Sequence, residues 1–429
     1  MIARGSYRAR ASVADGGDRR TFLFVSQVYV PDPAAVGQYM ADAAVELASR
    51  GHRVIVYTAD RGYDNPDARY PARETLGGVD VRRLPLSSLG KTHIAIRLLG
   101  GLLFVLQAVV RGAFIRRLDT VVVSTSPPLA PIAAVALSIL RGATVRLWLM
   151  DLNPDQIVAL KLAPPDSLPV RALEWLNRVV LRRAASVIVL DRFMAARVTR
   201  KVDVRHKMAV IPPWPHDDHL EIVPHSTNPF RERHQLNGKR VIMYSGNHGP
   251  SNPLTTLIEA AKRVADETGV VFMFVGGGVG KAEVEAAGVP NVRSLPYQPL
   301  RELKYSLSAA DVHVVTLGVD VVGIVHPCKI YSALAVARPV LYVGPRQSHV
   351  SDLIVEHGAG WSVAHGDVDG AVALLRGIAA LDERELRERG LRGRAAVVGE
   401  LSKASLCTRL CDVLVDGTGA PEQGRGAPR

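Results

Sequence analysis

Short apolar runs alternate along this chain with segments whose apolar residues recur at helical spacing. The run 21–26 is followed by a segment over 37–50 that places Met40 and Leu47 on one face, and then by a second run at 54–57. Strand, helix and strand joined by short loops are the repeating unit of a doubly wound sheet. The pattern therefore predicts an α/β fold built on parallel sheets.

The alternation restarts after residue 240, which predicts two Rossmann-like domains. The first series continues at 79–83, 120–124, 145–150 and 186–190. The second stands at 241–244, 270–275, 291–295, 312–316, 340–343 and 360–363. The proline-rich stretch 211–215 is stiff in composition and suits a linker. Ligands of open α/β sheets bind at the carboxyl ends of the strands, so we expect a cleft where the two domains face each other.

Length and composition agree with this organisation. At 429 residues the chain exceeds what one core usually serves, and its 48% apolar and 5% aromatic residues fit α/β layers rich in Ala, Val and Leu. The net charge of +12 suits nucleic acid, an acidic membrane surface or phosphorylated ligands. The basic residues are scattered and no nucleic-acid motif accompanies them, so we expect no nucleic acid partner.

The three cysteines indicate a reducing, cytoplasmic location, because they are too few for a disulfide framework. Cys407 and Cys411 stand one helical turn apart, but no other Cys or His has a matching spacing, so we expect core packing there and no metal. The first 20 residues lack the apolar core of a secretion signal.

The segment 94–117 combines a long apolar run with a basic end. Residues 98–110 are apolar apart from two glycines and Gln107, and the arginines Arg111, Arg116 and Arg117 follow. This run is shorter than the roughly 20 residues that cross a hydrocarbon core. It is either a core helix or a helix lying on an anionic leaflet, and the net charge favours the second interpretation.

Residues 326–341 place Lys329 at the start of a predicted helix. Pro327 suits the first helical turn, apolar residues follow at helical spacing, and the pair 338–339 would end the helix. The free N–H groups of that turn and the lysine ammonium would converge on one anion. An ordinary helix with a solvated lysine is the alternative.

Two glycine-rich turns follow strands of the second series. In 245–249, glycines let the backbone approach a phosphate, and Asn247 offers both a donor and an acceptor. The turn 276–278 stands at the same edge. Neither has the spacing of a dinucleotide fingerprint, which disfavours an NAD enzyme.

Seven short segments stand in a characteristic order: 51–54, 124–128, 150–154, 210–214, 244–247, 292–299 and 327–341. Their order resembles the family-4 glycosyltransferases of the GT-B fold, and among them the bacterial cell-surface sugar transferases of the fucosyl- and fucosaminyl-transferase type. The resemblance covers about 21–414.

The resemblance implies a retaining, metal-independent transfer of a hexosyl or N-acetylhexosaminyl group. The donor would be a nucleotide diphosphate sugar, with a UDP-sugar favoured, and the acceptor a hydroxyl of a lipid-linked or other glycan in cell-surface polysaccharide synthesis. No separate cofactor is implied. The apolar segment 94–117 with its basic end predicts that the enzyme is peripheral on the inner face of the cytoplasmic membrane. The charged start of the chain predicts a disordered arm over 1–20, and its Gly- and Pro-rich end a disordered tail over 417–429. Between them the resemblance implies an acceptor domain over 21–210, a donor domain over 211–400 and a closing helix over 401–416 that packs on the acceptor domain.

Carried over by position, the donor diphosphate would be approached by backbone glycines and neutralised by Lys329. Charge develops on the leaving diphosphate in the transition state, and a cation stabilises it. Tyr297 and Gln298 would lie beside the base, and Ser332 near the ribose. The implied donor residues are Gly246, Asn247, Gly277, Tyr297, Gln298, Ile330 and Ser332.

Asp151 follows a strand of the first series and is the second catalytic candidate, with an Asx turn or helix cap before Pro154 as the alternative. Gly37 would open the sugar end of the donor to the cleft. The further acceptor and cleft candidates are Gly37, Gln38, His93, Asp155 and His326.

The chain departs from the family at two positions where many members carry a glutamate pair, because it has Ile324 and Ser332 there. An arginine and a lysine that many members place after the first strand of the second half are also absent. These departures leave the nucleotide and the sugar open. A transferase acting on a soluble small molecule, a nucleotide-sugar epimerase, a pseudoenzyme and a nucleic-acid-binding protein remain as alternatives.

Overall fold

The computed structural model describes residues 19–32, 34–62, 67–87, 94–125, 127–216, 221–267 and 269–417, without the side chains of 94–98. The predicted terminal arms lie outside these residues, apart from 19–20 and 417. The chain divides into two compact units, the first formed by 1–155, 163–211 and 407–429 and the second by 156–162 and 212–406.

The first unit is built on an eight-stranded sheet of order β3-β4-β2-β1-β5-β6-β7-β8. All neighbouring pairs are parallel except β3 and β4. The strands are β1 (Thr21–Val25), β2 (Arg53–Ala59), β3 (Arg73–Leu76), β4 (Val79–Leu84), β5 (Thr120–Ser124), β6 (Thr144–Trp148), β7 (Ser186–Val189) and β8 (Met208–Val210).

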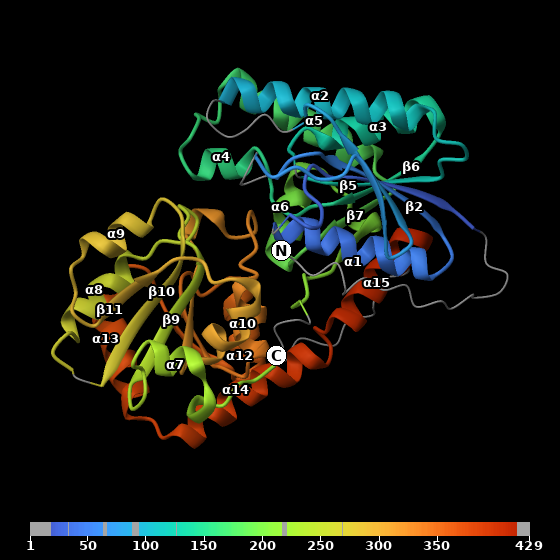
Figure 1. The fold of residues 1–429 in the computed structure, drawn as a ribbon. Helices are drawn as coiled ribbons and strands as arrows, with labels where there is room; N and C mark the ends of the chain where they lie inside the picture. The colour runs from blue at the N-terminus through green and yellow to red at the C-terminus, as the bar shows by residue number, and fades with distance from the viewer. Residues whose placement is uncertain are drawn as a thin grey trace. The chain divides into compact units, whose positions relative to one another are not determined.

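Helices cover both faces of this sheet, with α2, α3 and α5 on one side and α1 and α15 on the other (Figure 1). The helices are α1 (Ala35–Ser49), α2 (Ile94–Ala113), α3 (Ala130–Arg141), α5 (Leu168–Arg183), α6 (Arg192–Lys201) and α15 (Lys403–Asp416), with a 3-10 turn at Arg205–Lys207. The short helix α4 (Asp155–Ala159) belongs to the second unit except for its first residue. Among the described residues, no helix has both the length and the hydropathy to cross a membrane.

The last helix, α15, is attached to the first unit at several points. Arg50 forms an ion pair with Asp412 at 2.6 Å, and the thiol of Cys411 donates to the carbonyl oxygen of Ala43. Cys407 and Cys411 are both buried. From Cys407 onward, the helix is therefore part of the first unit, which is formed mainly by residues about 200 or more positions earlier.

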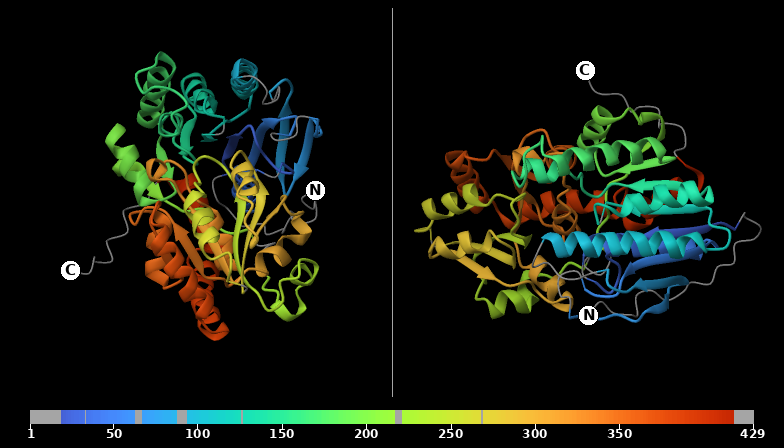
Figure 2. Two further views of the ribbon diagram at one scale, coloured as in Figure 1. Left: turned by 90° about the vertical axis from the view of Figure 1, so that its left-hand side faces the viewer. Right: turned by 90° about the horizontal axis from the view of Figure 1, so that it is seen from above.

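The second unit holds a parallel six-stranded sheet of order β11-β10-β9-β12-β13-β14, which also lies between helices (Figure 2). Its strands are β9 (Arg240–Asn247), β10 (Val270–Gly277), β11 (Val292–Leu295), β12 (Val312–Thr316), β13 (Val340–Val343) and β14 (Gly360–Val363). Its helices are α7 (Pro229–Arg233), α8 (Thr255–Arg263), α9 (Lys281–Ala286), α10 (Leu300–Ser308), α11 (Lys329–Ala335), α12 (His349–His357), α13 (Val368–Ala380) and α14 (Glu383–Val398), with 3-10 turns at His225–Thr227 and Val319–Val321.

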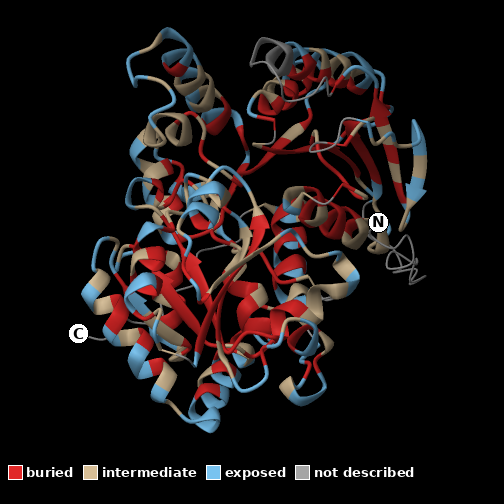
Figure 3. Cartoon of the chain, turned by 60° about the vertical axis from the view of Figure 1, so that its left-hand side comes forward, coloured by how far each residue is buried: buried red, intermediate tan, exposed pale blue. Residues whose placement is uncertain are grey.

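The central strands of both sheets are buried, while exposed residues gather on the outer sides of the helices (Figure 3). In the second unit, Tyr244, Phe272 and Leu341 from three strands pack with residues of α8 and α13 on one face of the sheet. Met243 and Met273 point to the other face and pack with Phe230 of α7. Burial on both faces explains why these strands read as continuous apolar runs in the sequence.

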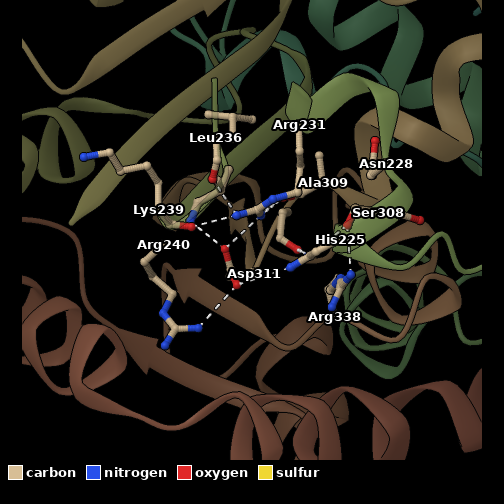
Figure 4. Close-up of polar contacts among 12 residues, drawn as sticks. His225, Asn228, Arg231, Leu236, Lys239, Arg240, Ser308, Ala309, Asp311 and Arg338 are labelled. Atoms are coloured by element: carbon tan, nitrogen blue, oxygen red, sulfur yellow. Dashed lines mark hydrogen bonds and ion pairs between the residues drawn. The ribbon is translucent and has the colours of Figure 1, made fainter. Parts of the chain in front are cut away.

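A buried network of charges holds the amino-terminal edge of the second sheet (Figure 4). Asp311, which precedes β12, accepts hydrogen bonds from the N–H of Val241 at 2.7 Å and from the guanidinium groups of Arg231 at 3.2 Å and Arg240 at 3.3 Å. His225 lies beside this group, and burial lowers its pKa to about 4, so it adds no charge at neutral pH. The network joins segments around the sheet at the edge opposite to Asn247, the last residue of β9.

The predicted fold class is confirmed, since both units are Rossmann-like and every predicted strand is present. Two strands were missed: β3, whose four residues are all at least partly exposed, and β8, which has three residues. The helix that contains Lys329 is shorter than predicted, because it ends at Ala335 and Ala337 adopts a positive φ of 54° before β13.

Candidate functional site

The strands β9 and β10 end side by side in a pair of glycines with unusual backbone angles. Gly246 pairs with Gly276 in the ladder, and their φ values are +133° and +140°. A Cβ atom on Gly276 would lie 2.0 Å from the carbonyl oxygen of Gly246. Only glycine fits these φ values and this close approach. The paired residues therefore place no side chain over the backbone at the carboxyl ends of β9 and β10.

The side chain of Lys329 crosses β9 at this point. A Cβ atom on Gly246 would lie 2.7 Å from Cε of the lysine, so the glycine makes room for it. The ammonium donates to the hydroxyl of Tyr244 and, at 3.2 Å, to the backbone oxygen of Asn247. It also lies 4.0 Å from the centre of the Tyr244 ring, within the range of a cation–π contact. The structure thus brings together Gly246, Asn247 and Lys329, which are separated by more than 80 positions.

Burial lowers the pKa of Lys329 to about 7. No carboxylate of the described residues forms an ion pair with its ammonium, whose partners are a hydroxyl, a carbonyl and an aromatic face. A half-buried cation that has only neutral partners gains the most from an anionic ligand. The geometry therefore suits a diphosphate at the carboxyl end of β9.

His248 is a buried residue at this edge that the sequence analysis missed. Its Nδ1 lies 3.3 Å from the carbonyl oxygen of Gly277, and its ring packs edge-on against Tyr244. Burial lowers its pKa, so the ring is neutral at pH 7. A histidine within the glycine-rich turn 245–249 was the available signal. Its contacts support the turn from within the fold.

The residues predicted to lie beside the nucleotide are on the turn after β11 and on α11. Tyr297 is 59% exposed, and its hydroxyl donates to the carbonyl oxygen of Gly277 at 3.4 Å, which places its ring at the end of β10. Gln298 donates to the carbonyl oxygen of Pro296 at 2.9 Å. Ser332 is half-buried, whereas Ile330 is fully buried and can act on a ligand only by supporting Lys329.

A chain of three side chains joins the loop before α11 to the start of α12. The hydroxyl of Tyr331 lies 2.8 Å from Nε2 of His326 and 2.7 Å from Nε2 of His349, and the two imidazole rings are 4.4 Å apart. His326 was predicted as a cleft residue, but Tyr331 and His349 were not. The tyrosine fixes the orientation of both rings, and only the fold brings His349 next to the loop.

The sequence predicted free N–H groups at the start of α11, but three of these N–H groups have acceptors within the protein. The N–H groups of Cys328, Ile330 and Tyr331 donate to the carbonyl oxygens of His326, Pro327 and Cys328. Pro327 also lies before the helix rather than inside its first turn. The positive charge at this position therefore comes from the ammonium of Lys329.

In the first unit, Asp151 follows β6 at the carboxyl edge of the sheet. The hydroxyl of Thr125, which follows β5, accepts hydrogen bonds from the N–H groups of Met150 at 3.2 Å and Asp151 at 3.1 Å. This contact fixes the loop that carries the carboxyl group. Burial raises the pKa of Asp151 to about 6, a value suited to accepting a proton near neutral pH.

The other predicted acceptor residues differ in their surroundings. Asp155 forms an ion pair with Lys201, which also binds Glu174, so its carboxylate already has a charged partner. Gly37 lies in the first turn of α1, where a Cβ atom would be 3.0 Å from the backbone of Tyr29. Gln38 is half-buried on the same turn. His93 lies outside the described residues.

Among the described residues, one group of side chains has the composition of a metal site. It consists of Glu356, His357 and Glu400, and both glutamates are exposed. None of these residues belongs to the predicted donor or acceptor sets.

Comparison with known proteins identifies one matching family and two curated relatives. Residues 34–214 match the family described as Glycosyl transferase 4-like domain. The chain is 29% identical to the probable glycosyltransferase WbjE of Pseudomonas aeruginosa over 64% of this chain and 69% of that protein. It is 28% identical to the putative colanic acid biosynthesis glycosyl transferase WcaI of Escherichia coli K12 over 72% of this chain and 79% of that protein.

Solved structures show the same fold at low sequence identity. Sucrose-phosphate synthase from Thermosynechococcus elongatus aligns over 92% of this chain and 98% of its own, with a TM-score of 0.73 and 18% identity. HepE of Anabaena in complex with UDP-glucose aligns over 92% of this chain and 99% of its own, with a TM-score of 0.65 and 15% identity. The predicted GT-B fold class is thereby confirmed, and the two curated relatives support glycosyltransferase activity.

Proposed function

We propose that this protein is a retaining, metal-independent glycosyltransferase that moves a sugar from a UDP-sugar to a hydroxyl of a lipid-linked or other glycan in cell-surface polysaccharide synthesis. The contact of Lys329 with the glycine-flanked end of β9 is the observation that carries the proposal. The name of WcaI supports a polysaccharide product, and the bound UDP-glucose of HepE supports a UDP donor. The transferred group would be of the hexosyl or N-acetylhexosaminyl type, as in the fucosyl- and fucosaminyl-transferase branch.

The chemistry requires that negative charge on the leaving diphosphate be stabilised. In the reaction, the bond between the anomeric carbon and the diphosphate oxygen breaks, and a bond to the acceptor oxygen forms on the same face of the sugar. The acceptor proton passes to the departing diphosphate. Lys329 supplies a cation at the diphosphate in a partly desolvated site, where a charge interaction is stronger than in water. This cation is our basis for proposing a transfer without a metal.

The two positions of the missing glutamate pair have different environments. Ile324 is buried, so its side chain is part of the core, whereas Ser332 is half-buried on α11. A serine hydroxyl can donate to or accept from a ribose hydroxyl but adds no charge. We therefore propose that the ribose is held beside Ser332 by neutral hydrogen bonds, with Tyr297 next to the base.

The acceptor side of the proposal rests on Asp151 and on helix α2. An acceptor hydroxyl needs a hydrogen-bond acceptor near it, and a carboxyl group with a pKa of about 6 is largely ionised at pH 7. A lipid-linked acceptor also requires the enzyme to reach a membrane surface.

Helix α2 presents an apolar stripe to solvent. The exposed residues recur at spacings of three and four, with exposed fractions of 50% to 84%: Leu99, Leu102, Leu106, Val110 and Phe114. The exposed Arg111, Arg116 and Arg117 stand at the end of the stripe. An amphipathic helix with a basic end suits the interface of an anionic leaflet. We propose that this stripe holds the enzyme peripherally on the inner face of the cytoplasmic membrane.

A donor panel tests the proposed function directly. Thermal unfolding is measured with UDP-, GDP-, dTDP- and ADP-sugars, and a ligand at 100 times its dissociation constant should add about 2.7 kcal/mol of stability. We expect the largest shift with a UDP-sugar. Sugar transfer should continue in excess EDTA. Loss of transfer with EDTA that magnesium or manganese restores would contradict the metal-independent mechanism, and absence of a shift with all four nucleotides would contradict the donor site.

A further inference from the structure

The first unit contains a basic cavity at the edge of its sheet opposite to Asp151. It has a volume of about 440 Å³ and lies where β1, β5 and β6 begin. Its lining includes residues just before β1, at the start of β5 and in the turn between α3 and β6, which the parallel register brings together. Substrates of open α/β sheets bind at the carboxyl edge, so this cavity is separate from the proposed catalytic edge.

Four arginines line the cavity: Arg19, Arg20, Arg141 and Arg146. The carboxylate in the lining belongs to Asp119. It accepts a hydrogen bond from the N–H of Thr21 at 2.7 Å and so contacts the first residue of β1. Four guanidinium groups against one carboxylate leave a local excess of three positive charges. A cavity with such an excess has a positive potential that attracts anions.

The hydrogen bonds that these arginines make within the protein do not neutralise them. Arg20 and Arg146 donate to the carbonyl oxygen of Val415 at the end of α15, and Arg141 donates to that of Ala113 at the end of α2. Each guanidinium has five N–H donors, so capping a helix end uses only part of its capacity. Helix-capping positions the arginines and leaves their charge available.

Arg146 is the innermost cation and is 7% exposed. Its Nε is buried and makes no hydrogen bond within the described part of the chain. Burial, together with the nearby charge of Arg20, lowers the pKa of Arg146, and the charge of Asp416 offsets this shift only in part. A buried donor without a partner is costly, and a ligand with several acceptor oxygens removes that cost.

We propose that this cavity binds a phosphate group. Phosphate oxygens match the planar fork of guanidinium groups, and the hydroxyls of Thr120 and Thr144 in the lining add neutral donors. The group comes either from a free phosphate or from a phospholipid headgroup. The second source is within reach because Arg141 contacts the end of α2, next to the stripe proposed to lie on the membrane. The site is independent of the donor chemistry at Lys329.

Binding of inorganic pyrophosphate, followed by isothermal titration calorimetry at constant ionic strength, tests the site. The wild type should bind two molecules, one in this cavity and one at the donor site. The double variant with Arg19→Gln and Arg141→Gln should bind pyrophosphate at least about tenfold more weakly in the cavity. Lys329→Ala should instead lose binding at the donor site. Arg263→Gln with Arg376→Gln, which changes two exposed arginines of the second unit, is the matched control and should keep both sites.

The two variants separate this proposal from the proposed function. If the Arg19/Arg141 variant binds pyrophosphate with the stoichiometry and affinity of the wild type, the cavity is no phosphate site, whatever the transferase assay shows. Loss of binding by Lys329→Ala concerns the donor site alone. Because Arg141 caps α2, the single variant Arg19→Gln, at an exposed position, provides the same readout if the double variant unfolds.

Flotation with vesicles of phosphatidylcholine, with or without phosphatidylglycerol, distinguishes the two sources. If the Arg19/Arg141 variant loses binding both to pyrophosphate and to vesicles with phosphatidylglycerol, the site binds a lipid headgroup. If it loses pyrophosphate but floats like the wild type, the ligand is a free phosphate. Retention of both would overturn the proposal.

Discussion

The ammonium of Lys329 donates to the backbone oxygen of Asn247 at 3.2 Å, across a glycine that leaves no side chain between them. This contact joins the start of α11 to the end of β9. It places a cation where the two glycine-rich strand ends of the second unit meet. This contact, together with Asp151 and helix α2 of the first unit, leads to five testable expectations.

Lys329→Ala should lower turnover on the order of 100-fold or more, because the variant lacks the cation that stabilises the leaving diphosphate. The melting temperature should stay close to that of the wild type, since the lysine is half-buried and makes no ion pair among the described residues. Steady-state sugar transfer and thermal unfolding measure the two effects. Lys262→Ala, which removes an exposed lysine paired with Glu259, is the control. Unchanged turnover in the Lys329 variant would remove it from the mechanism.

Binding of UDP should take up a proton above pH 7. The pKa of the free Lys329 ammonium is lowered to about 7 by burial, and a bound diphosphate raises it again. Affinity should therefore fall by up to about tenfold for each pH unit above 7. His248 does not contribute in this range, because its pKa lies below 6.5. Calorimetry in buffers of different ionisation enthalpy measures the uptake, and Lys329→Ala should abolish it.

The lowered pKa of Lys329 also affects how the stability of the unliganded protein depends on pH. Since the folded-state pKa lies below the unfolded value of 10.5, the unfolded chain binds more protons between pH 7 and 10.5. The contribution of Lys329 to stability therefore becomes more favourable as the pH rises through this window. A contribution of the opposite sign in a comparison of wild type and Lys329→Ala would contradict the lowered pKa.

Asp151→Asn should increase stability while reducing activity. The pKa of this carboxyl group is raised from 3.8 to about 6, so its contribution is lost as the pH rises from 3.8 through 6. Replacing this partly buried charge should raise the free energy of unfolding at pH 7.5 by up to about 3 kcal/mol, with no difference below about pH 4. Urea unfolding at both pH values measures this effect. Transfer should fall at least about tenfold if the carboxylate binds the acceptor hydroxyl. Asp166→Asn, at an exposed position, should change neither property.

Attachment to vesicles should require both the apolar stripe and the arginines at its basic end. Reversal of Arg111, Arg116 and Arg117 to Glu should weaken binding to anionic vesicles on the order of 100-fold, because each basic residue contributes about 1 kcal/mol near the surface. Leu102→Ser with Leu106→Ser should also prevent flotation. Val355→Ser with Val398→Ser, which changes two exposed valines of the second unit, should float like the wild type. A wild type that stays at the bottom at low salt would favour a soluble acceptor.

Much of the fold could be predicted because its signals are local. Strands such as β9 and β12 are buried on both faces and therefore appear as apolar runs, whereas β3 at the sheet edge is polar and exposed and leaves no such signal. The roles proposed for Gly246 and Lys329 came from short motifs after a strand and before a helix. The helix end at Ala335 is followed by the positive φ of Ala337, whose backbone is closely approached by Gly390 of α14. That contact joins residues more than 50 positions apart, so no local pattern indicates it.

By itself the sequence determined the order of strands and helices, the two-domain division and the lysine that stands before an apolar helix. Those features depend on periodicity and on residues close together in the chain. Only the tertiary structure decided that Tyr331 links His326 to His349 and that Arg19, Arg141 and Arg146 share one cavity with Asp119. These groups come from separate strand ends and loops, and their proximity follows from parallel pairing in the sheets. Burial also decides their charge and pKa, and burial is a property of the packed chain.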